Sequence, residues 1–427
     1  METSAKTPKG HVRWGIGILL GTGVVVNYLD RTNISVAGEK MASQYGWSHT
    51  ELGFMLSAFF WTYTLMQIPV GVLLDKLGVK WITRVGTFLW SLATIGTAFL
   101  GGFGGIAAMR MLLGITEAPA FPANSKATGY WFPLRERGLA TSIFDGAAKF
   151  SNVIGVGIST WAIMNWGWRG AFVVTGLINL VFALVFWIIY RDPSEHKMLT
   201  QEEREYIVQN GAQQAGQAEG SVVGSFVKLL AQRKVWGLTL GFMAYGYTFY
   251  LFLTWLPDYM TKQMHMSMAK GGLYTVIPWI VATITDIFIG GWMVDHFIKK
   301  GYNPNKVRKT ILILGMILGA FVILQPTTTN PNLQITYLSI ALGGLAFSAP
   351  VGWSIPSLIA PKGMVGSVGS IMNFFNNLMG VAAPIITGYI IDKTGSFNTG
   401  FIIAGVIIIF GIFSYSFILG DINPIEL

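Results

Sequence analysis

The chain of 427 residues has no cysteine and few charged residues. The lack of cysteine excludes disulfide bonds, thiol nucleophiles and cysteine-ligated metals. Lysine, arginine, aspartate and glutamate make up only 11% of the residues, whereas 52% are hydrophobic. Soluble domains carry about 25% charged residues. The composition therefore excludes a soluble globular protein and predicts a protein that crosses the lipid bilayer many times.

Histidine is also scarce. The five histidines are all expected in loops or at helix ends, and none has a carboxylate at metal-ligand spacing in the middle of an apolar run. The sequence therefore predicts no metal site and no other cofactor. The apolar runs also lack a serine and histidine arrangement suited to nucleophilic catalysis, which argues against an enzyme.

Apolar runs, in contrast, are abundant. A helix needs about 20 apolar residues to cross the bilayer. Twelve runs have this length, so the sequence predicts an all-α integral membrane protein with twelve transmembrane helices. The predicted spans are 14–36, 50–74, 82–101, 103–129, 138–163, 170–190, 236–258, 270–294, 308–327, 332–359, 364–390 and 397–420.

The only long polar segment lies between the sixth and seventh predicted spans. It divides the chain into an N-terminal six-helix bundle (1–190), a central loop (191–235) and a C-terminal six-helix bundle (236–427). Within the loop, Thr200 followed by Gln-Glu-Glu predicts a capped surface helix. The stretch 211–220, rich in glycine, glutamine and alanine, is typical of a flexible linker.

Basic residues are distributed unevenly between the two sides of the membrane. One side has the N-terminus, the loop after the second span, the central loop and the cluster at 299–309, whereas the other has only scattered lysines and one arginine. The positive-inside rule places the first side, with both termini, in the cytoplasm. The net charge of +9 then reflects this bias and contact with anionic lipid, and no nucleic-acid partner is expected.

A short motif recurs in both halves. A glycine precedes an aspartate by four residues, with basic residues just beyond it, after the second span and again after the eighth. Glycine permits close helix packing, and aspartate can cap the next helix. A third copy, 388–393, ends the eleventh span. We expect these loops to act in gating, through Gly71, Asp75, Lys76, Gly78, Lys80 and Asp295.

Asp30 and Arg31 interrupt the first apolar run near its middle. A charge at mid-bilayer costs at least ~2.5–3.5 kcal/mol, so such residues usually face a bundle interior or a substrate pathway. Neighbours on a helix point about 100° apart, so these two cannot pair well with each other. Each is expected to find its own partner elsewhere, either in a structural ion pair or in a transport pathway.

Several segments resemble a known family. The loop 71–80 is similar to the signature loop of the major facilitator superfamily, except that Val79 stands where a basic residue is usual. Other segments resemble the anion:cation symporter family, which includes bacterial proton symporters for galactonate, glucarate and hexuronate and, more distantly, vesicular glutamate and sialic-acid carriers. These segments are 27–33, 57–63, 67–69, 110–122, 131–133 and 252–257.

The resemblance implies roles for individual residues. Asp30 and Glu117 match proton sites, and Arg31 matches the arginine that receives the substrate carboxylate. Substrate contacts are implied for Tyr28, Tyr63, Trp353 and Asn373. Pro350 and Gly352 stand where the sugar-acid carriers tend to have hydroxyl residues, which leaves fewer donors for a hydroxylated substrate.

Arg110 and Glu117 are seven residues apart and are therefore expected on one helix face. The prolines at 119 and 122 remove backbone donors and predict a bend next to Glu117. A carboxyl group near arginines, whose proton affinity changes as a substrate anion comes and goes, is suited to proton coupling. The alternative is a static network of Asp30, Arg110 and Glu117 that holds the N-terminal half together.

Lys149, Asp145 and Asp286 do not fit the sugar-acid pattern. Since the fifth and eighth helices of the superfamily face each other, Lys149 and Asp286 are predicted to pair between the halves. Such a pair would gate the halves or hold Lys149 as a second cation for a dianionic or phosphorylated substrate. The alternative is that Asp145 and Lys149 neutralise each other as an i,i+4 pair.

Together these observations predict a proton-coupled symporter that imports an organic anion, most readily a sugar acid (hexonate, hexuronate or aldarate), by alternating access. The alternatives are a carrier of dicarboxylates, aromatic acids or phosphorylated anions, and an exchanger or uniporter. The expected partners are a small organic anion, protons and the lipid bilayer. A single chain has both halves, so it is expected to work as a monomer in a cell membrane, namely a bacterial inner membrane.

Overall fold

The computed structural model describes residues 10–133, 136–212, 228–361 and 364–425, and its regular elements there are all helical. The N-terminal half contains α1 (Val12–Tyr45), α2 (His49–Phe99), α3 (Gly102–Glu117), α4 (Ala120–Trp131) and α5 (Arg137–Ile189), followed by α6 (Gln201–Gln209). The C-terminal half contains α8 (Arg233–Asp258), η1 (Tyr259–Gln263), α9 (Met268–Thr285), η2 (Asp286–Met293), α10 (Val294–Lys299), α11 (Pro304–Gly319), η3 (Ala320–Thr327), α12 (Pro331–Ser354), α13 (Pro356–Ile359), α14 (Val365–Thr394), α15 (Asn398–Phe413) and η4 (Ser414–Ile418).

These elements form the twelve expected passages. Helices α2 and α5 each contain two passages, because Gly78 (φ 75°) and Gly167 (φ 70°) have left-handed backbone angles that interrupt the helix. Glycine adopts such angles without steric cost. Helices α3 and α4 together form the fourth passage and are separated at Ala118 and Pro119, next to the predicted bend. The expected spans of the all-α membrane fold are therefore confirmed.

The ends of the passages differ from the sequence-based limits. Helix α1 runs from Val12 to Tyr45, whereas the apolar run covers only 14–36. Helix α8 begins at Arg233 and so includes the last residues assigned to the central loop. Helices continue past the apolar core because backbone hydrogen bonds form equally well among polar residues, and hydropathy reports only the part in lipid.

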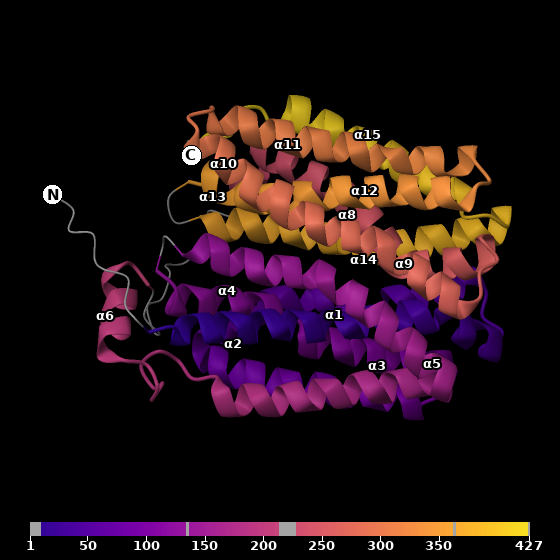
Figure 1. The fold of residues 1–427 in the computed structure, drawn as a ribbon, viewed down its shortest axis with the longest axis horizontal. Helices are drawn as coiled ribbons and strands as arrows, with labels where there is room; N and C mark the ends of the chain where they lie inside the picture. Colours follow the sequence, from indigo (N-terminus) through magenta and orange to yellow (C-terminus); the bar gives the residue numbers. More distant parts are fainter. Residues whose placement is uncertain (1–9, 134–135, 213–227, 362–363, 426–427) are drawn as a thin grey trace.

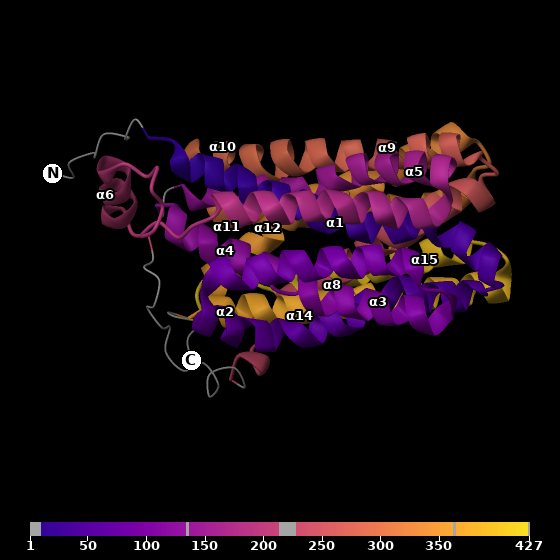
Figure 2. The same cartoon turned by 90° about the horizontal axis from the view of Figure 1, so that it is seen from below.

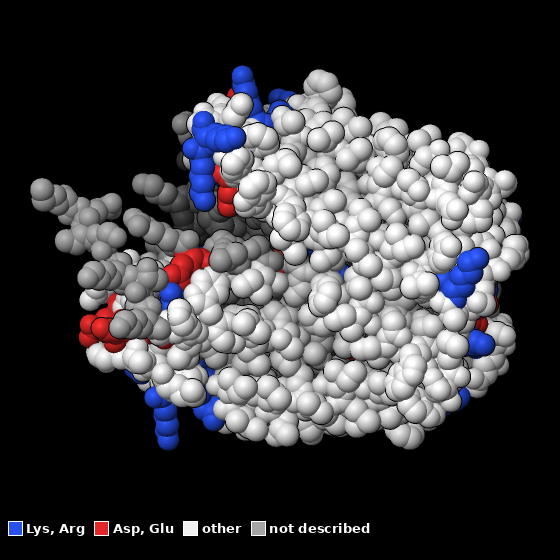
Figure 3. Space-filling model, viewed as in Figure 1, with Lys and Arg blue, Asp and Glu red and all other residues white. Residues whose placement is uncertain are grey.

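The distribution of charge fits a membrane-embedded bundle. In the space-filling view, charged side chains gather at the two ends of the molecule, with a broad uncharged band between them (Figure 3). Large apolar side chains are exposed in the body of the bundle, including Leu65, Val181 and Phe410. Among the described residues, seven helical segments are by themselves long and apolar enough to cross a bilayer. The band has the character expected for contact with lipid tails.

The helices of the two halves of the chain lie in separate layers (Figure 1). The main contacts between them are those of α1 with α8, α2 with α14 and α5 with α9, and α5 also contacts η2. Both chain termini and α6 lie at one end of the bundle (Figures 1 and 2). At this end α4, α10 and α13 pack mainly within their own half. The exact domain limits and the cytoplasmic placement of this end stay predictions.

Helix α6 begins as predicted, since the Thr200 side chain accepts a hydrogen bond from the Glu203 backbone N–H. It is not a fully exposed helix, however. The Glu203 carboxylate is buried and pairs with Arg13 at 2.8 Å, and Arg13 also pairs with Glu136 at 2.7 Å. Burial opposes ionisation of Glu136, but hydrogen bonds from Arg13 and Tyr206 outweigh it and lower the pKa of this carboxyl. These contacts fix α6 against the N-terminal half. Most of the predicted linker, 213–220, lies outside the described residues.

Candidate functional site

Arg31 and Glu117 form a buried ion pair inside the N-terminal half. Arg31 lies near the middle of α1, and Glu117 is the last residue of α3, just before the break at Ala118. The Arg31 Nε atom is 3.6 Å from Glu117 Oε2, and neither atom has a hydrogen-bond partner. The pair is therefore held by charge alone, and both groups keep free hydrogen-bonding capacity.

Aromatic rings surround the Arg31 guanidinium. Its central carbon is 4.6 Å from the ring centres of Tyr28 and Phe59 and 4.8 Å from that of Tyr63. The Asn27 side-chain oxygen accepts one hydrogen bond from Arg31 at 3.1 Å. Tyr28 and Tyr63, for which the resemblance implies substrate contacts, turn their ring faces to the cation. Such stacking orients a guanidinium fork while leaving its edge available to a carboxylate.

Asp30 points away from Arg31, as its position on the helix predicts, and has its own partners. Its Oδ2 atom accepts a hydrogen bond from Asn179 at 2.7 Å, whereas Oδ1 has none. Arg110 donates to the Asp30 backbone carbonyl at 3.2 Å and stacks on Phe59. Charge interactions link Glu117 with Asp30, Arg31 and Arg110. The four residues thus form one buried cluster.

Lys149 connects the two halves. Its ammonium group is 2.7 Å from Asp145 Oδ2, one turn earlier on α5, and 3.3 Å from Asp286 Oδ1, the first residue of η2. Lys149 and Asp286 are both buried. Both contacts considered from the sequence are present, so the i,i+4 pair does not exclude the pair between the halves.

Aromatic and amide side chains of the C-terminal half lie next to these charges. Tyr245 interacts with the charge of Lys149, and its ring neighbours Phe242, which in turn contacts Trp353. Trp353 is itself 41% exposed. Asn373 accepts a hydrogen bond from Asn377 at 3.1 Å.

Tyr250 connects the two amide side chains, Asn373 and Asn377, with the N-terminal half. Asn377 accepts a hydrogen bond from the Tyr250 hydroxyl at 2.9 Å, and the Tyr250 ring contacts Phe60 of α2. Asn373 is therefore connected to the N-terminal half through Asn377 and Tyr250. Trp353 is connected to Lys149 through Phe242 and Tyr245. The contact of Asn373 and Trp353 with substrate stays a prediction.

The predicted gating residues lie at the end with the chain termini. Gly78 has the positive φ that separates two helices, and Lys80 pairs with Glu195 at 2.6 Å. Lys76 and Asp295 are exposed. The burial of Gly71 and the side chain of Asp75 lie outside what the structure describes. Their gating role stays a prediction.

Several polar residues of the site were not singled out from the sequence. They are Asn27, Asn179, Tyr245, Tyr250 and Asn377. The tyrosines left a signal, since Tyr245, Tyr247 and Tyr250 lie together inside an apolar run, whereas tyrosine is usually enriched at the membrane interfaces. The asparagines left none, because an isolated asparagine in a span reveals no partner.

Comparisons with known proteins agree with the resemblance. The model of the Major Facilitator Superfamily matches residues 20–384. The uncharacterised transporter YybO of Bacillus subtilis (strain 168) is 46% identical, over 98% of this chain and 96% of its own. The probable galactarate/D-glucarate transporter GarP of Escherichia coli (strain K12) is 34% identical, over 100% of this chain and 99% of its own.

The fold also matches a solved structure. A bacterial homologue of the human lysosomal transporter Spinster, in an inward-facing and occupied conformation, superposes with a TM-score of 0.74. The match covers 96% of this chain and 97% of that chain at 16% sequence identity, so it concerns the fold alone. Because the family model matches most of the sequence and the relatives are similar over their whole length, the chain is a transporter, not an enzyme, and belongs to the major facilitator superfamily.

Proposed function

We propose that this transporter imports a sugar acid together with protons by alternating access. The observation that carries the proposal is the Arg31 and Glu117 pair, in which the cation suited to a substrate carboxylate is occupied by a carboxylate of the protein. A substrate carboxylate that takes the edge of Arg31 displaces Glu117 from its counter-charge. Glu117, buried and without that cation, then favours its neutral form and takes up a proton.

The charges of this buried cluster, taken together with Lys149 and its two acid partners, support proton binding. Three cations face four acids, so the net charge is −1 when all seven side chains are ionised. The cations are Arg31, Arg110 and Lys149, and the acids are Asp30, Glu117, Asp145 and Asp286. One bound proton neutralises the set, which is favourable in a site of low dielectric constant. Asp30 and Glu117 are the proton sites that we propose.

Lys149 favours a sugar acid with two carboxylates. Arg31 and Lys149 provide two buried cations, and an aldarate such as galactarate carries a carboxylate at each end. The relative GarP is named as a probable galactarate/D-glucarate transporter. The inside-negative membrane potential opposes entry of a dianion, so uptake of an aldarate gains from the potential only when more than two protons enter with it.

Uptake into proteoliposomes tests the proposal. The purified chain is reconstituted with a pH-sensitive dye inside, and galactarate, D-glucarate, galactonate and glucuronate are added under an inward proton gradient. We expect internal acidification that depends on one of these compounds, and its loss in Glu117→Gln. Substrate counterflow without acidification would instead identify a uniporter or exchanger and would remove the proton roles of Asp30 and Glu117.

A further inference from the structure

The end of the bundle opposite the chain termini is tightly closed. Here α2 of one half meets α14 of the other, and two glycines let their backbones touch. A Cβ atom added at Gly53 would lie 2.5 Å from the Pro384 carbonyl oxygen, and one added at Gly388 would lie 2.2 Å from the His49 carbonyl oxygen. Asp392 accepts hydrogen bonds from the backbone N–H groups of His49 at 2.9 Å and Thr50 at 2.7 Å. These contacts join the halves.

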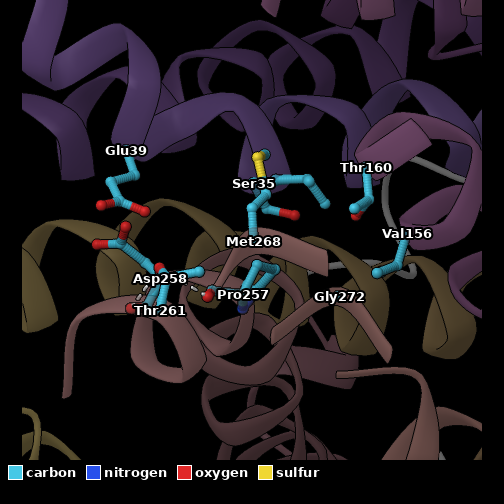
Figure 4. A pocket seen from close by; sticks show the side chains of 10 residues that line it. Ser35, Glu39, Val156, Thr160, Pro257, Asp258, Thr261, Met268 and Gly272 are labelled. Atoms are coloured by element: carbon cyan, nitrogen blue, oxygen red, sulfur yellow. Dashed lines mark hydrogen bonds between the residues drawn. The ribbon is translucent and has the colours of Figure 1, made fainter. Parts of the chain in front are cut away.

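A small cavity lies within this closed interface. Its volume is about 10 Å³, which is at the lower limit for a single water molecule. Side chains from both halves line it, including Ser35, Glu39 and Thr160 from the N-terminal half and Asp258, Thr261 and Met268 from the C-terminal half. In the close-up, the carboxylates of Glu39 and Asp258 point toward one another from opposite halves (Figure 4).

Asp258 is only 3% exposed, and neither of its carboxylate oxygens has a hydrogen-bond partner. Three groups interact with its charge, each from a different element: Lys262 of η1, Glu39 of α1 and His49 of α2. The nearest nitrogen, Lys262 Nζ, is 3.7 Å away, beyond hydrogen-bond distance, and its side chain is 32% exposed. Lys262 is partly hydrated and His49 contacts Asp392, so neither hydrogen-bonds the Asp258 carboxylate, and an unsatisfied buried carboxylate is costly.

We propose that Glu39 and Asp258 form a proton-binding site that holds this end of the transporter closed. In the closed state Asp258 holds a proton and donates an O–H···O hydrogen bond to the Glu39 carboxylate of the other half. Two facing carboxylates cannot both ionise easily when one of them is as buried as Asp258, because like charges repel at low dielectric constant. When the halves separate, both groups become hydrated and the proton leaves to the solution on that side.

This site has a different role from Asp30 and Glu117, the proposed proton-coupling residues. It exchanges its proton with the solution only on the side that opens, so the proton regulates closure and is not carried across. The direction of the pH effect follows from the position of the site in the closed interface. Low pH on that side, which is predicted to be the outer side, favours closure, and high pH favours opening. The proposal rests on the alternating access of the proposed function but not on proton symport.

Distance measurements across the interface test the proposal. The chain lacks cysteine, so spin labels can be placed at Ser43→Cys on α1 and Ala269→Cys on α9, two exposed positions in opposite halves. Pulsed EPR is recorded in nanodiscs without substrate, between about pH 5 and about pH 8. We expect the ratio of long to short distances to rise with pH, by at most about tenfold per unit, because one proton is linked to closure.

Substitution of either acid is expected to remove this response. Asp258→Asn keeps the shape of the side chain, and its amide can donate to Glu39 at every pH, so the labelled ends stay close throughout. Glu39→Gln, at a half-buried position, provides a second variant should Asp258→Asn fail to fold. A pH response in both variants equal to that of the parent would overturn the proposal. So would opening on acidification, or a response to sodium at constant pH.

Two controls separate this site from other titrating groups. His49→Gln removes the histidine that contacts Asp392, and it is expected to keep the pH response. Loss of the response in His49→Gln alone would assign it to the histidine instead. Glu117→Gln is expected to keep the response while losing proton uptake in liposomes. Failure of the proposed proton symport and failure of this site are thereby distinguishable.

Discussion

Three buried cations of the described membrane region have specific neighbours. Arg31 faces Glu117, Arg110 binds the backbone at Asp30, and Lys149 lies between Asp145 and Asp286. Such residues are expensive in a bilayer, and pairing reduces that cost. In the proposed function a substrate anion replaces one partner of such a pair, and the new contact offsets the loss of the old one.

Lys149 provides a prediction at the residue scale. In Lys149→Gln, we expect uptake of an aldarate to fall by at least about tenfold, since a charge-assisted hydrogen bond contributes about 1.5–3 kcal/mol. Uptake of galactonate, with one carboxylate for Arg31, is expected to fall less. Radiolabelled uptake of both compounds measures the difference.

The matched control is Lys149→Arg, which keeps the charge. Equal losses for both substrates would show that Lys149 holds the halves together and does not bind the second carboxylate. Asp286→Asn adds a further comparison: it leaves transport nearly intact if the i,i+4 pair with Asp145 is sufficient for Lys149.

Among the helices, glycine determines how closely the two halves approach. Gly53 and Gly388 lie where α2 and α14 meet, and Gly272 of α9 lies against Thr160 of α5. In each case an added Cβ atom would fall within 3.0 Å of the other half. Small residues at helix contacts are typical of membrane proteins. Here they lie on the surfaces that the proposed alternating access would separate.

Gly53→Ala tests whether the close contact of α2 with α14 stabilises the closed state. The new methyl group would meet the Pro384 carbonyl, which is backbone and cannot rotate away, so the closed state is expected to lose about 1–3 kcal/mol. The labelled pair at 43 and 269 should then show more of the long distance at every pH. Gly157→Ala on α5 is the matched control, because a Cβ atom there meets nothing within 4 Å. Identical distance distributions in both variants would refute the expectation.

The distribution of basic residues predicts which end of the molecule faces the cytoplasm. Both termini and α6 lie at one end (Figure 1), and lysine and arginine side chains gather at this end on the face that Figure 3 shows. Bacterial inner-membrane proteins keep such an end in the cytoplasm. The closed interface, with Glu39 and Asp258, would then face outward in this state.

Labelling of intact cells measures the orientation. A membrane-impermeant maleimide is expected to modify Ser43→Cys in intact cells, and Met198→Cys in the central loop only after permeabilisation, since both positions are exposed. The parent chain has no cysteine and provides the control for labelling at other residues. The opposite pattern would place the termini outside and would reverse the side on which acid favours closure.

The sequence by itself determined the membrane class, the twelve passages, the break beside Glu117 and the α6 cap. Each of these depends on residues close together in the chain, because lipid exposure, helix capping and proline effects act locally. It also singled out Asp30, Arg31, Arg110, Glu117, Lys149 and Asp286, since a charge in an apolar run stands out without any knowledge of its neighbours.

Only the tertiary structure decided which charges meet. Glu117 faces Arg31 from 86 residues away, Glu203 reaches Arg13, and Glu39 points at Asp258 of the other half. Glu39 and Asp258 lie near the ends of their helices, where charged residues are common and draw no attention in a sequence. Their burial comes from the packing of the halves, which depends on contacts between distant residues and leaves no local pattern.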